Sequence, residues 1–175
     1  MPEDAPGELV AGHLHEEEMA DPIHELAVTW LIALFREWLG KRGFVFSSDV
    51  RMALSDQLGR KPDVAVFLPG GHHPPRRGAL QHPPDIVVEV VTPSPKDERR
   101  DRVEKMTEYA AFGVHFYWLV DPALGSLEIF ELGKDNRYTK VLGETEGVIT
   151  PVPGCTGLEL SLNELWDDLN RLRDD

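Results

Sequence analysis

Three residues of the sequence have the types and spacing that metal-assisted chemistry requires: Asp63, Glu89 and Lys105. Asp63 follows Pro62 and precedes an apolar run, and Glu89 lies inside the β-branched run at residues 85–91. An acid inside a strand that is buried on both faces is unfavourable unless another group binds it. Two carboxylates on neighbouring strands can hold Mg²⁺, a hard cation that takes a few carboxylate oxygens and keeps its waters. A nearby ammonium such as that of Lys105 can stabilise a pentavalent phosphate or orient a water molecule.

Both acids also have a purely structural interpretation. Asp63 can be an ordinary edge-strand or turn acid after a proline, and Glu89 can be a core acid that an ion pair neutralises. Other kinds of site have less support, since the sequence contains no glycine-rich phosphate loop, no G-x-S-x-G elbow and no H-E-x-x-H motif. The one cysteine, Cys155, excludes an internal disulfide framework and suits a reducing compartment.

Periodicity and capping signals predict the elements that carry these residues. A first helix is expected to begin at Asp21-Pro22 and to end near Gly40. Residues 44–54 and 61–68 are expected to form a hairpin, and residues 85–91 a strand buried on both faces. The remaining elements are a helix over 96–112, strands over 114–120, 126–132 and 138–142, and a last helix that opens with a capping box at 161–164. This order predicts an α/β fold of the α+β kind, in which helices flank a mixed sheet.

The helix that carries Lys105 is expected to face the core with another set of side chains. Val103, Met106 and Ala110 recur at helical spacing and are predicted to form its core stripe. Lys105 lies off that stripe, next to Tyr109. Truncating it is therefore expected to change the free energy of unfolding by less than about 0.5 kcal/mol.

Length and charge set the broad class. A chain of 175 residues fits one domain with its own core, and it has neither a membrane-length apolar run nor signal-peptide features, so we expect a cytoplasmic protein. The net charge of −13 argues against nucleic acid as a partner, but it is concentrated at the ends. Residues 1–25 carry −8 and residues 159–175 carry −4, against −1 for residues 26–158. Residues 1–20 show no periodicity and are expected to form an acidic mobile arm, followed by a single domain over residues 21–175.

Several short motifs occur in an order that is specific as a set. They are RKPDVAVF at 60–67, PPDIVVEVVTPS at 83–94, Asp101 with Lys105 and Tyr109, YWLVDP at 117–122, and PG-x3-LEL-x4-LW from residue 153. His24 opens the first helix. Over residues 21–170 this set resembles the Uma-two family of restriction-endonuclease-like proteins, within the PD-(D/E)XK nuclease superfamily.

The resemblance implies a role for each matching residue. Asp63 is the aspartate of the PD motif and Glu89 is the acid of the (D/E)XK motif, and both would bind Mg²⁺ or Mn²⁺. Val91 stands where the motif lysine is expected. The resemblance implies that Lys105 on the next helix takes its place. Asp85 and Glu25 are expected to support the site.

The leading hypothesis is a Mg²⁺-dependent endonuclease that hydrolyses DNA phosphodiester bonds on a restriction-endonuclease-like αβββαβ core. A homodimer is expected, because two sites related by a two-fold axis suit cleavage of both strands. Arg99, Arg100 and Arg102 are expected to contact the DNA backbone. The alternative is a catalytically inactive module on the same fold, which serves binding or oligomerisation. The intact acid pair favours the enzyme, and the net acidity favours the module.

Overall fold

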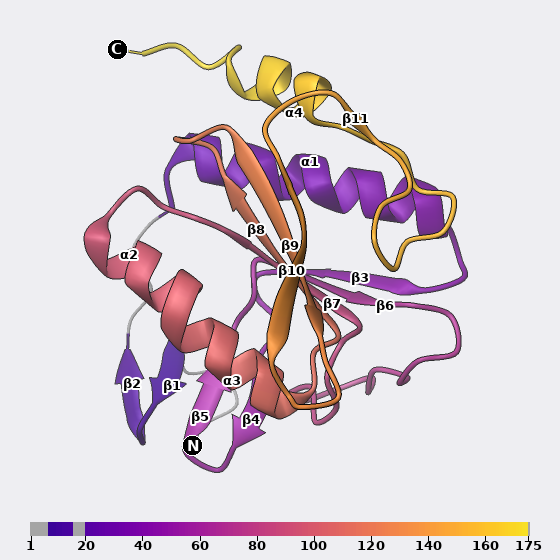
Figure 1. Ribbon diagram of the computed structural model, residues 1–175. Coiled ribbons are helices and arrows are strands. Elements are labelled where there is room, and N and C mark those ends of the chain that lie inside the picture. The colour runs from indigo at the N-terminus through magenta and orange to yellow at the C-terminus, as the bar shows by residue number, and fades with distance from the viewer. Residues whose placement is uncertain (1–6, 16–19, 175) are drawn as a thin grey trace.

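The computed structural model describes residues 7–15 and 20–174, and a six-stranded mixed sheet is at its centre (Figure 1). In spatial order its strands are β10 (Tyr138–Glu144), β9 (Ser126–Leu132), β8 (Phe116–Asp121), β7 (Ile86–Val90), β6 (Val64–Phe67) and β3 (Phe44–Ser47). Neighbouring strands are antiparallel except β7 and β8, which are parallel. A parallel pair requires a crossover connection, and a helix supplies it here.

The crossover helix has three consecutive segments: α2 (Pro95–Arg99), a π-helical turn η1 (Arg100–Glu104) and α3 (Lys105–Phe112). Ser94 caps the first turn by accepting a hydrogen bond from the N–H of Asp97. Gly113 ends the helix with a φ of 98°, a left-handed conformation that favours glycine. The helix expected over residues 96–112 is therefore confirmed in its extent.

The core stripe expected on this helix is partly wrong. Ala110 is buried and Met106 is half-buried, but Val103 is 58% exposed. Asp101 and Lys105, which were not expected in the core, are buried instead. The π-helical turn adds a residue to one turn, so the face that follows it is rotated relative to a regular helix.

Helices cover both faces of the central sheet. On one face, α1 (Pro22–Leu39) and α4 (Leu162–Leu169) pack on an apolar cluster in which the rings of Phe35 and Trp118 lie 5.1 Å apart. Both helices begin where expected: Pro22 is the first residue of α1, and the Ser161 side chain caps α4 through the N–H of Glu164. On the other face, the crossover helix packs on a second cluster that includes Tyr117. No helix among residues 7–15 and 20–174 is long and apolar enough to cross a membrane.

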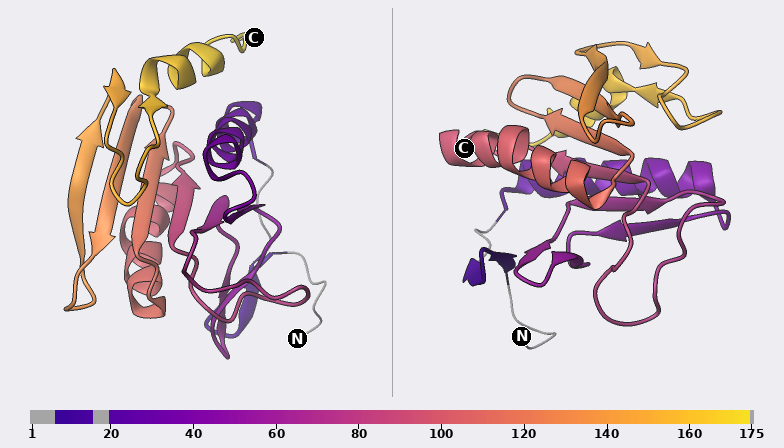
Figure 2. Two further views of the ribbon diagram at one scale, coloured as in Figure 1. Left: turned by 90° about the vertical axis from the view of Figure 1, so that its right-hand side faces the viewer. Right: turned by 60° about the horizontal axis from the view of Figure 1, so that its bottom comes forward.

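A second sheet of four short strands, in the order β2-β1-β5-β4, lies beside the crossover helix (Figure 2). Its strands are β1 (Glu8–Val10), β2 (His13–His15), β4 (Met52–Ser55) and β5 (Leu58–Arg60). The expectation of an arm without regular structure is wrong for β1 and β2, because Leu9 pairs with Gly59. Residues 1–6 and 16–19 of the expected arm lie outside the described residues.

The strand expected over residues 44–54 is two strands in two different sheets. Its first part, β3, pairs with β6 as expected, with Phe44 opposite Phe67. Its second part, β4, forms a hairpin with β5, which was not expected. A two-stranded pair of β11 (Val148–Ile149) and β12 (Leu160–Ser161) completes the structure.

Candidate active site

Asp63 stands directly before β6 and faces the last residues of β7. Its Oδ2 accepts a hydrogen bond of 2.7 Å from the N–H of Val90. The same oxygen lies 3.2 Å from Nε2 of His24, at the start of α1. The antiparallel register of β6 and β7, continued by one residue, places Asp63 opposite Glu89. The fold therefore brings together the two acids that the sequence singled out.

The groups around Asp63 favour its ionised form. Burial alone would raise its pKa, but the hydrogen bond and charge of His24 and the charge of Lys105 outweigh burial and hold the pKa below its usual value. Burial would likewise lower the pKa of His24, but Asp63 and Glu25 raise it to about 9. The His24 ring is therefore protonated at neutral pH and forms an ion pair with Asp63.

Glu89 lies inside β7 with 2% of its surface exposed. The Tyr109 hydroxyl donates to its Oε1 at 2.5 Å, and Nζ of Lys105 lies 2.9 Å from its Oε2. Burial raises the pKa of Glu89 most; Lys105 opposes this, and Asp63 and Asp101 add to it, so the pKa rises to about 8. The site holds more carboxylates than ammonium groups, and Glu89 is the acid that takes up a proton near neutral pH.

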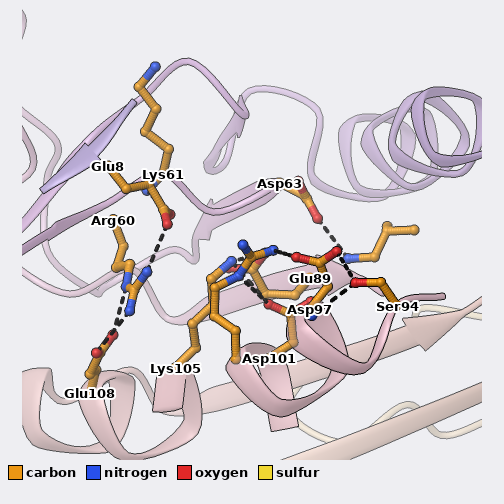
Figure 3. Close-up of polar contacts among 12 residues, drawn as sticks. Glu8, Arg60, Lys61, Asp63, Glu89, Ser94, Asp97, Asp101, Lys105 and Glu108 are labelled. Atoms are coloured by element: carbon orange, nitrogen blue, oxygen red, sulfur yellow. Dashed lines mark hydrogen bonds and ion pairs between the residues drawn. The ribbon is translucent and has the colours of Figure 1, made fainter. Parts of the chain in front are cut away.

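Lys105 is the first residue of α3 and only 4% exposed. Its Nζ lies 3.2 Å from Oδ1 of Asp101 as well as beside Glu89 (Figure 3). Burial lowers the pKa of an ammonium, but Glu89 and Asp101 raise the pKa of Lys105 above its usual value and keep it charged. We call Asp63, Glu89, Asp101 and Lys105 the acid–lysine cluster. The expectation that Lys105 can be truncated at little cost rested on its lying outside the core, and that placement is wrong.

The π-helical turn gives Lys105 its position. The N–H of Lys105 donates to the carbonyl of Arg100, five residues back, whereas in a regular α-helix it would donate to that of Asp101. The Tyr117 hydroxyl, which comes from β8, donates to the Asp101 carbonyl at 2.7 Å. Tyr117 on the sheet therefore donates to the Asp101 carbonyl, which the N–H of Lys105 would bond in a regular α-helix.

Sequence reasoning did not assign a site role to Asp101, Tyr109 or Tyr117. The spacing of Asp101, Lys105 and Tyr109 at i, i+4 and i+8 is the signal that would have found the first and third, because it places all three on one helix face. No comparable signal marks Tyr117. It lies on another element, β8, and its hydroxyl reaches the Asp101 carbonyl only because the crossover helix packs on the sheet.

A second buried ion-pair group joins the N-terminal hairpin to the crossover helix (Figure 3). Arg60 donates through Nη1 to Glu8 at 2.8 Å and through Nε and Nη2 to Glu108 at 2.7 and 2.9 Å. Burial would raise the pKa of Glu8, but the charges of Lys105 and Arg60 lower it. Glu8 therefore stays ionised and extends the electrostatic environment of Lys105.

The two residues expected to support the site behave differently. Glu25 is largely exposed, and its Oε1 lies 3.4 Å from Nδ1 of His24, so it acts on the cluster only through His24. Asp85 lies at the opposite end of β7, where its Oδ2 accepts a hydrogen bond of 2.7 Å from the N–H of Leu68. The structure does not bring Asp85 to the acid–lysine cluster.

The three arginines expected to contact DNA are mostly paired with acids. Arg99 is 78% exposed and makes one long contact of 3.8 Å with Glu104. Arg100 contacts Asp97 at 2.7 Å and Asp101 at 3.5 Å, and Arg102 contacts Glu128 at 2.5 Å and Asp121 at 3.1 Å. The charges of Arg100 and Arg102 are therefore largely neutralised within the protein.

The carboxylate oxygens of the acid–lysine cluster suit a hard cation that takes few ligands from the protein. The described residues contain no group of three or more His, Cys, Asp or Glu side chains arranged around a metal position. Mg²⁺ commonly takes one or two carboxylates and completes its shell with water and phosphate oxygens, as Asp63 and Glu89 would allow. Each Glu89 oxygen accepts one bond, from Tyr109 or Lys105, and a carboxylate oxygen can accept two.

Comparison with known proteins shows to which protein family the chain belongs. Residues 1–163 match the model of the Uma2 (Uma-two) family, described as "putative restriction endonuclease". The chain belongs to the Uma2 family. The match includes the N-terminal hairpin, which the motifs over residues 21–170 did not cover. The chain matches none of the curated proteins.

The fold of this Uma2 protein is similar to a crystal structure from Anabaena variabilis, titled a "putative nuclease belonging to DUF820". The two share 17% identity at a TM-score of 0.74, over 97% of this chain and 94% of that one. The expected restriction-endonuclease-like fold, a mixed α+β sheet flanked by helices, is confirmed. In this Uma2 protein the lysine near the acids comes from α3, while Val91 occupies the position two residues after Glu89.

Proposed function

We propose that this Uma2 protein is a Mg²⁺- or Mn²⁺-dependent endonuclease that hydrolyses phosphodiester bonds in DNA. The observation that carries the proposal is the position of Asp63 opposite Glu89 across β6 and β7, with Lys105 bonded to Glu89. Membership of a family described as "putative restriction endonuclease" and a nuclease-like fold support the same class.

In this proposal each side chain of the site has a defined task. Asp63 and Glu89 would hold the cation, which when bound would polarise the phosphate and lower the pKa of a coordinated water. His24 keeps Asp63 ionised, and the N–H of Val90 fixes the direction of its Oδ2. Lys105 supplies a fixed positive charge where a phosphate gains negative charge in the transition state.

A second candidate is a non-catalytic binding or oligomerisation module on the same fold. The observation in its favour is that Tyr109 and Lys105 already bond both oxygens of Glu89. A buried network of this kind can have a purely structural role. The two candidates differ in one measurable property, because only the nuclease needs a divalent cation.

The deciding experiment is a cleavage assay on plasmid and single-stranded DNA with Mg²⁺, Mn²⁺ or EDTA. The wild-type chain should cleave only with a divalent cation, and Glu89→Gln should reduce the rate by on the order of a hundredfold or more. Glu131→Gln is the matched control: it makes the same acid-to-amide change on β9, where the side chain contacts the exposed His115 and not the acid–lysine cluster, so cleavage should be unchanged. A folded wild-type chain that neither cleaves DNA nor binds these cations at millimolar concentration would establish the module instead.

A further inference from the structure

The sequence predicted DNA contacts by Arg99, Arg100 and Arg102, but these residues offer little positive charge to a phosphate. Arg100 and Arg102 are paired with acids of this chain, and Arg99 is a single exposed cation. A protein gains affinity for DNA by neutralising phosphates and releasing their counterions. A cation that a carboxylate already neutralises contributes little to this. A DNA contact therefore requires other cations.

The loop between β6 and β7, residues 69–84, carries such cations, and we call it the basic loop. It is the long connection at the right of Figure 1. Arg76 and Arg77 are exposed, and within the described part of the chain no acidic side chain forms an ion pair with either. No Asp or Glu occurs from residue 64 to residue 84, in a chain whose net charge is −13. The basic loop is thus a positive segment in an acidic protein.

The basic loop is anchored to the central sheet at its base and to the second sheet further along. Asp85 accepts a hydrogen bond from the N–H of Leu68, and a Cβ at Gly71 would come within 2.5 Å of Oδ2 of Asp85. Further along, the buried Leu80 exchanges backbone hydrogen bonds of 2.8 and 2.9 Å with Arg51 and Ala53 beside β4. The function of Asp85 is therefore to fix this loop.

Aromatic contacts order the exposed part of the basic loop. The rings of His72 and His82 stack at 4.7 Å with an angle of 10°, and His73 meets the edge of Phe44 at 4.9 Å. A loop that is ordered before binding loses less conformational entropy when it contacts a ligand. Arg76 and Arg77 lie between these contacts in the chain, so they project from an ordered support.

The basic loop lies on the same face of the sheet as the acid–lysine cluster. Leu80 belongs to the apolar cluster that also contains Tyr109, the partner of Glu89. Asp63 precedes β6 and Leu68 follows it, so the cluster and the start of the basic loop lie at opposite ends of this strand.

We propose that the basic loop binds the phosphate backbone of duplex DNA through Arg76 and Arg77, while the acid–lysine cluster faces another part of the same duplex. This inference rests on the proposed function, because it identifies how that site holds its substrate. The contact is with phosphates and carries no sequence information by itself.

The test measures DNA binding without cleavage. A fluorescent duplex of 20 base pairs is titrated with the full-length chain in EDTA, and anisotropy is recorded from 50 to 200 mM salt. The variant is Arg76→Ala/Arg77→Ala. The control, Lys134→Ala/Arg137→Ala, removes the same charge from the exposed turn between β9 and β10, at the other edge of the sheet. Circular dichroism confirms that each variant is folded.

The loop variant should bind about tenfold or more weakly at 100 mM salt, and its log K against log salt slope should fall by about two. The control should stay within about twofold of the wild type. Equal losses in the two variants, an unchanged loop variant, or a wild-type chain that does not bind duplex DNA at 50 mM salt would each overturn the inference. Failure of the proposed function has a different signature: Glu89→Gln and wild type would both lack cleavage while binding through the loop persists.

Discussion

Replacing Lys105 with methionine should destabilise this protein strongly. Methionine keeps an unbranched apolar side chain but removes the ammonium that lies 2.9 Å from Glu89 and 3.2 Å from Asp101. Both carboxylates are 2% exposed, so water cannot replace the lost partner. Removing one partner of a buried ion pair costs about 3–5 kcal/mol. An exposed lysine would cost less than about 0.5 kcal/mol, so the measurement separates the two placements.

The cost of Lys105→Met should increase with pH. Burial, together with Asp63 and Asp101 and against Lys105, raises the pKa of Glu89 to about 8, above its unfolded value of 4.5. Between these values the folded state binds more protons than the unfolded state, so stability falls as pH rises, by up to about 1.4 kcal/mol per pH unit. Without Lys105 a protonated Glu89 needs no counter-charge. Asp101 loses its contact with Lys105 at every pH, so the cost should be smaller at pH 5 than at pH 9 rather than absent.

The assay is urea unfolding followed by tryptophan fluorescence at pH 5, 7 and 9. Lys134→Met, at an exposed turn, is the control and should match the wild type. The double variant Glu89→Gln/Lys105→Met should recover about 2 kcal/mol of the loss at pH 9, because it removes one of the unpaired charges. A loss under about 0.5 kcal/mol at pH 9, or no recovery in the double variant, would refute the assignment of a buried ion pair.

Three further predictions rest on the contacts of these buried groups, and a fourth rests on the sequence. Glu89→Gln should flatten the fall in stability that the wild type shows as pH rises from 4.5 to about 8, as urea unfolding across that range will show. Tyr117→Phe should cost about 1–3 kcal/mol, because the Asp101 carbonyl loses its donor, and should lower kcat of any cleavage without changing KM. Arg60→Met should cost about 3–5 kcal/mol and speed hydrogen exchange in residues 8–15, which the ion pair of Arg60 with Glu8 holds in place. Light scattering should show the homodimer expected from the sequence; a monomer at micromolar concentration would contradict it.

Local signals in the sequence determined much of the framework of this protein. Asp21-Pro22 and Gly40 marked the two ends of α1, and the β-branched run around Glu89 marked β7. Helix caps and strand periodicity depend on residues within about one turn or a few positions of each other, so they can be recognised without knowledge of the fold. The candidate acids Asp63 and Glu89 were found for the same reason, because each interrupts an otherwise apolar local pattern.

The short strands of the second sheet could not be predicted from the sequence, because they depend on pairing with a distant strand. β1 has three residues, and Leu9 gains a partner in Gly59 from a distant part of the chain. A strand of this length has no usable periodicity, and its backbone groups are satisfied only when a partner strand lies beside it. The acidic N-terminus therefore carried no local signal that it contributes a strand and places Glu8 near Lys105.

The burial of Lys105 was also decided by the tertiary structure. A lysine on a helix is ordinarily expected at the surface, because an isolated buried charge is strongly unfavourable. Here the crossover helix packs where Glu89 and Asp101 supply counter-charges, and Tyr117 supports the π-helical turn that aligns them. Whether a charge can be buried depends on partners from other elements, and these partners are brought together only when the sheet and the helix pack.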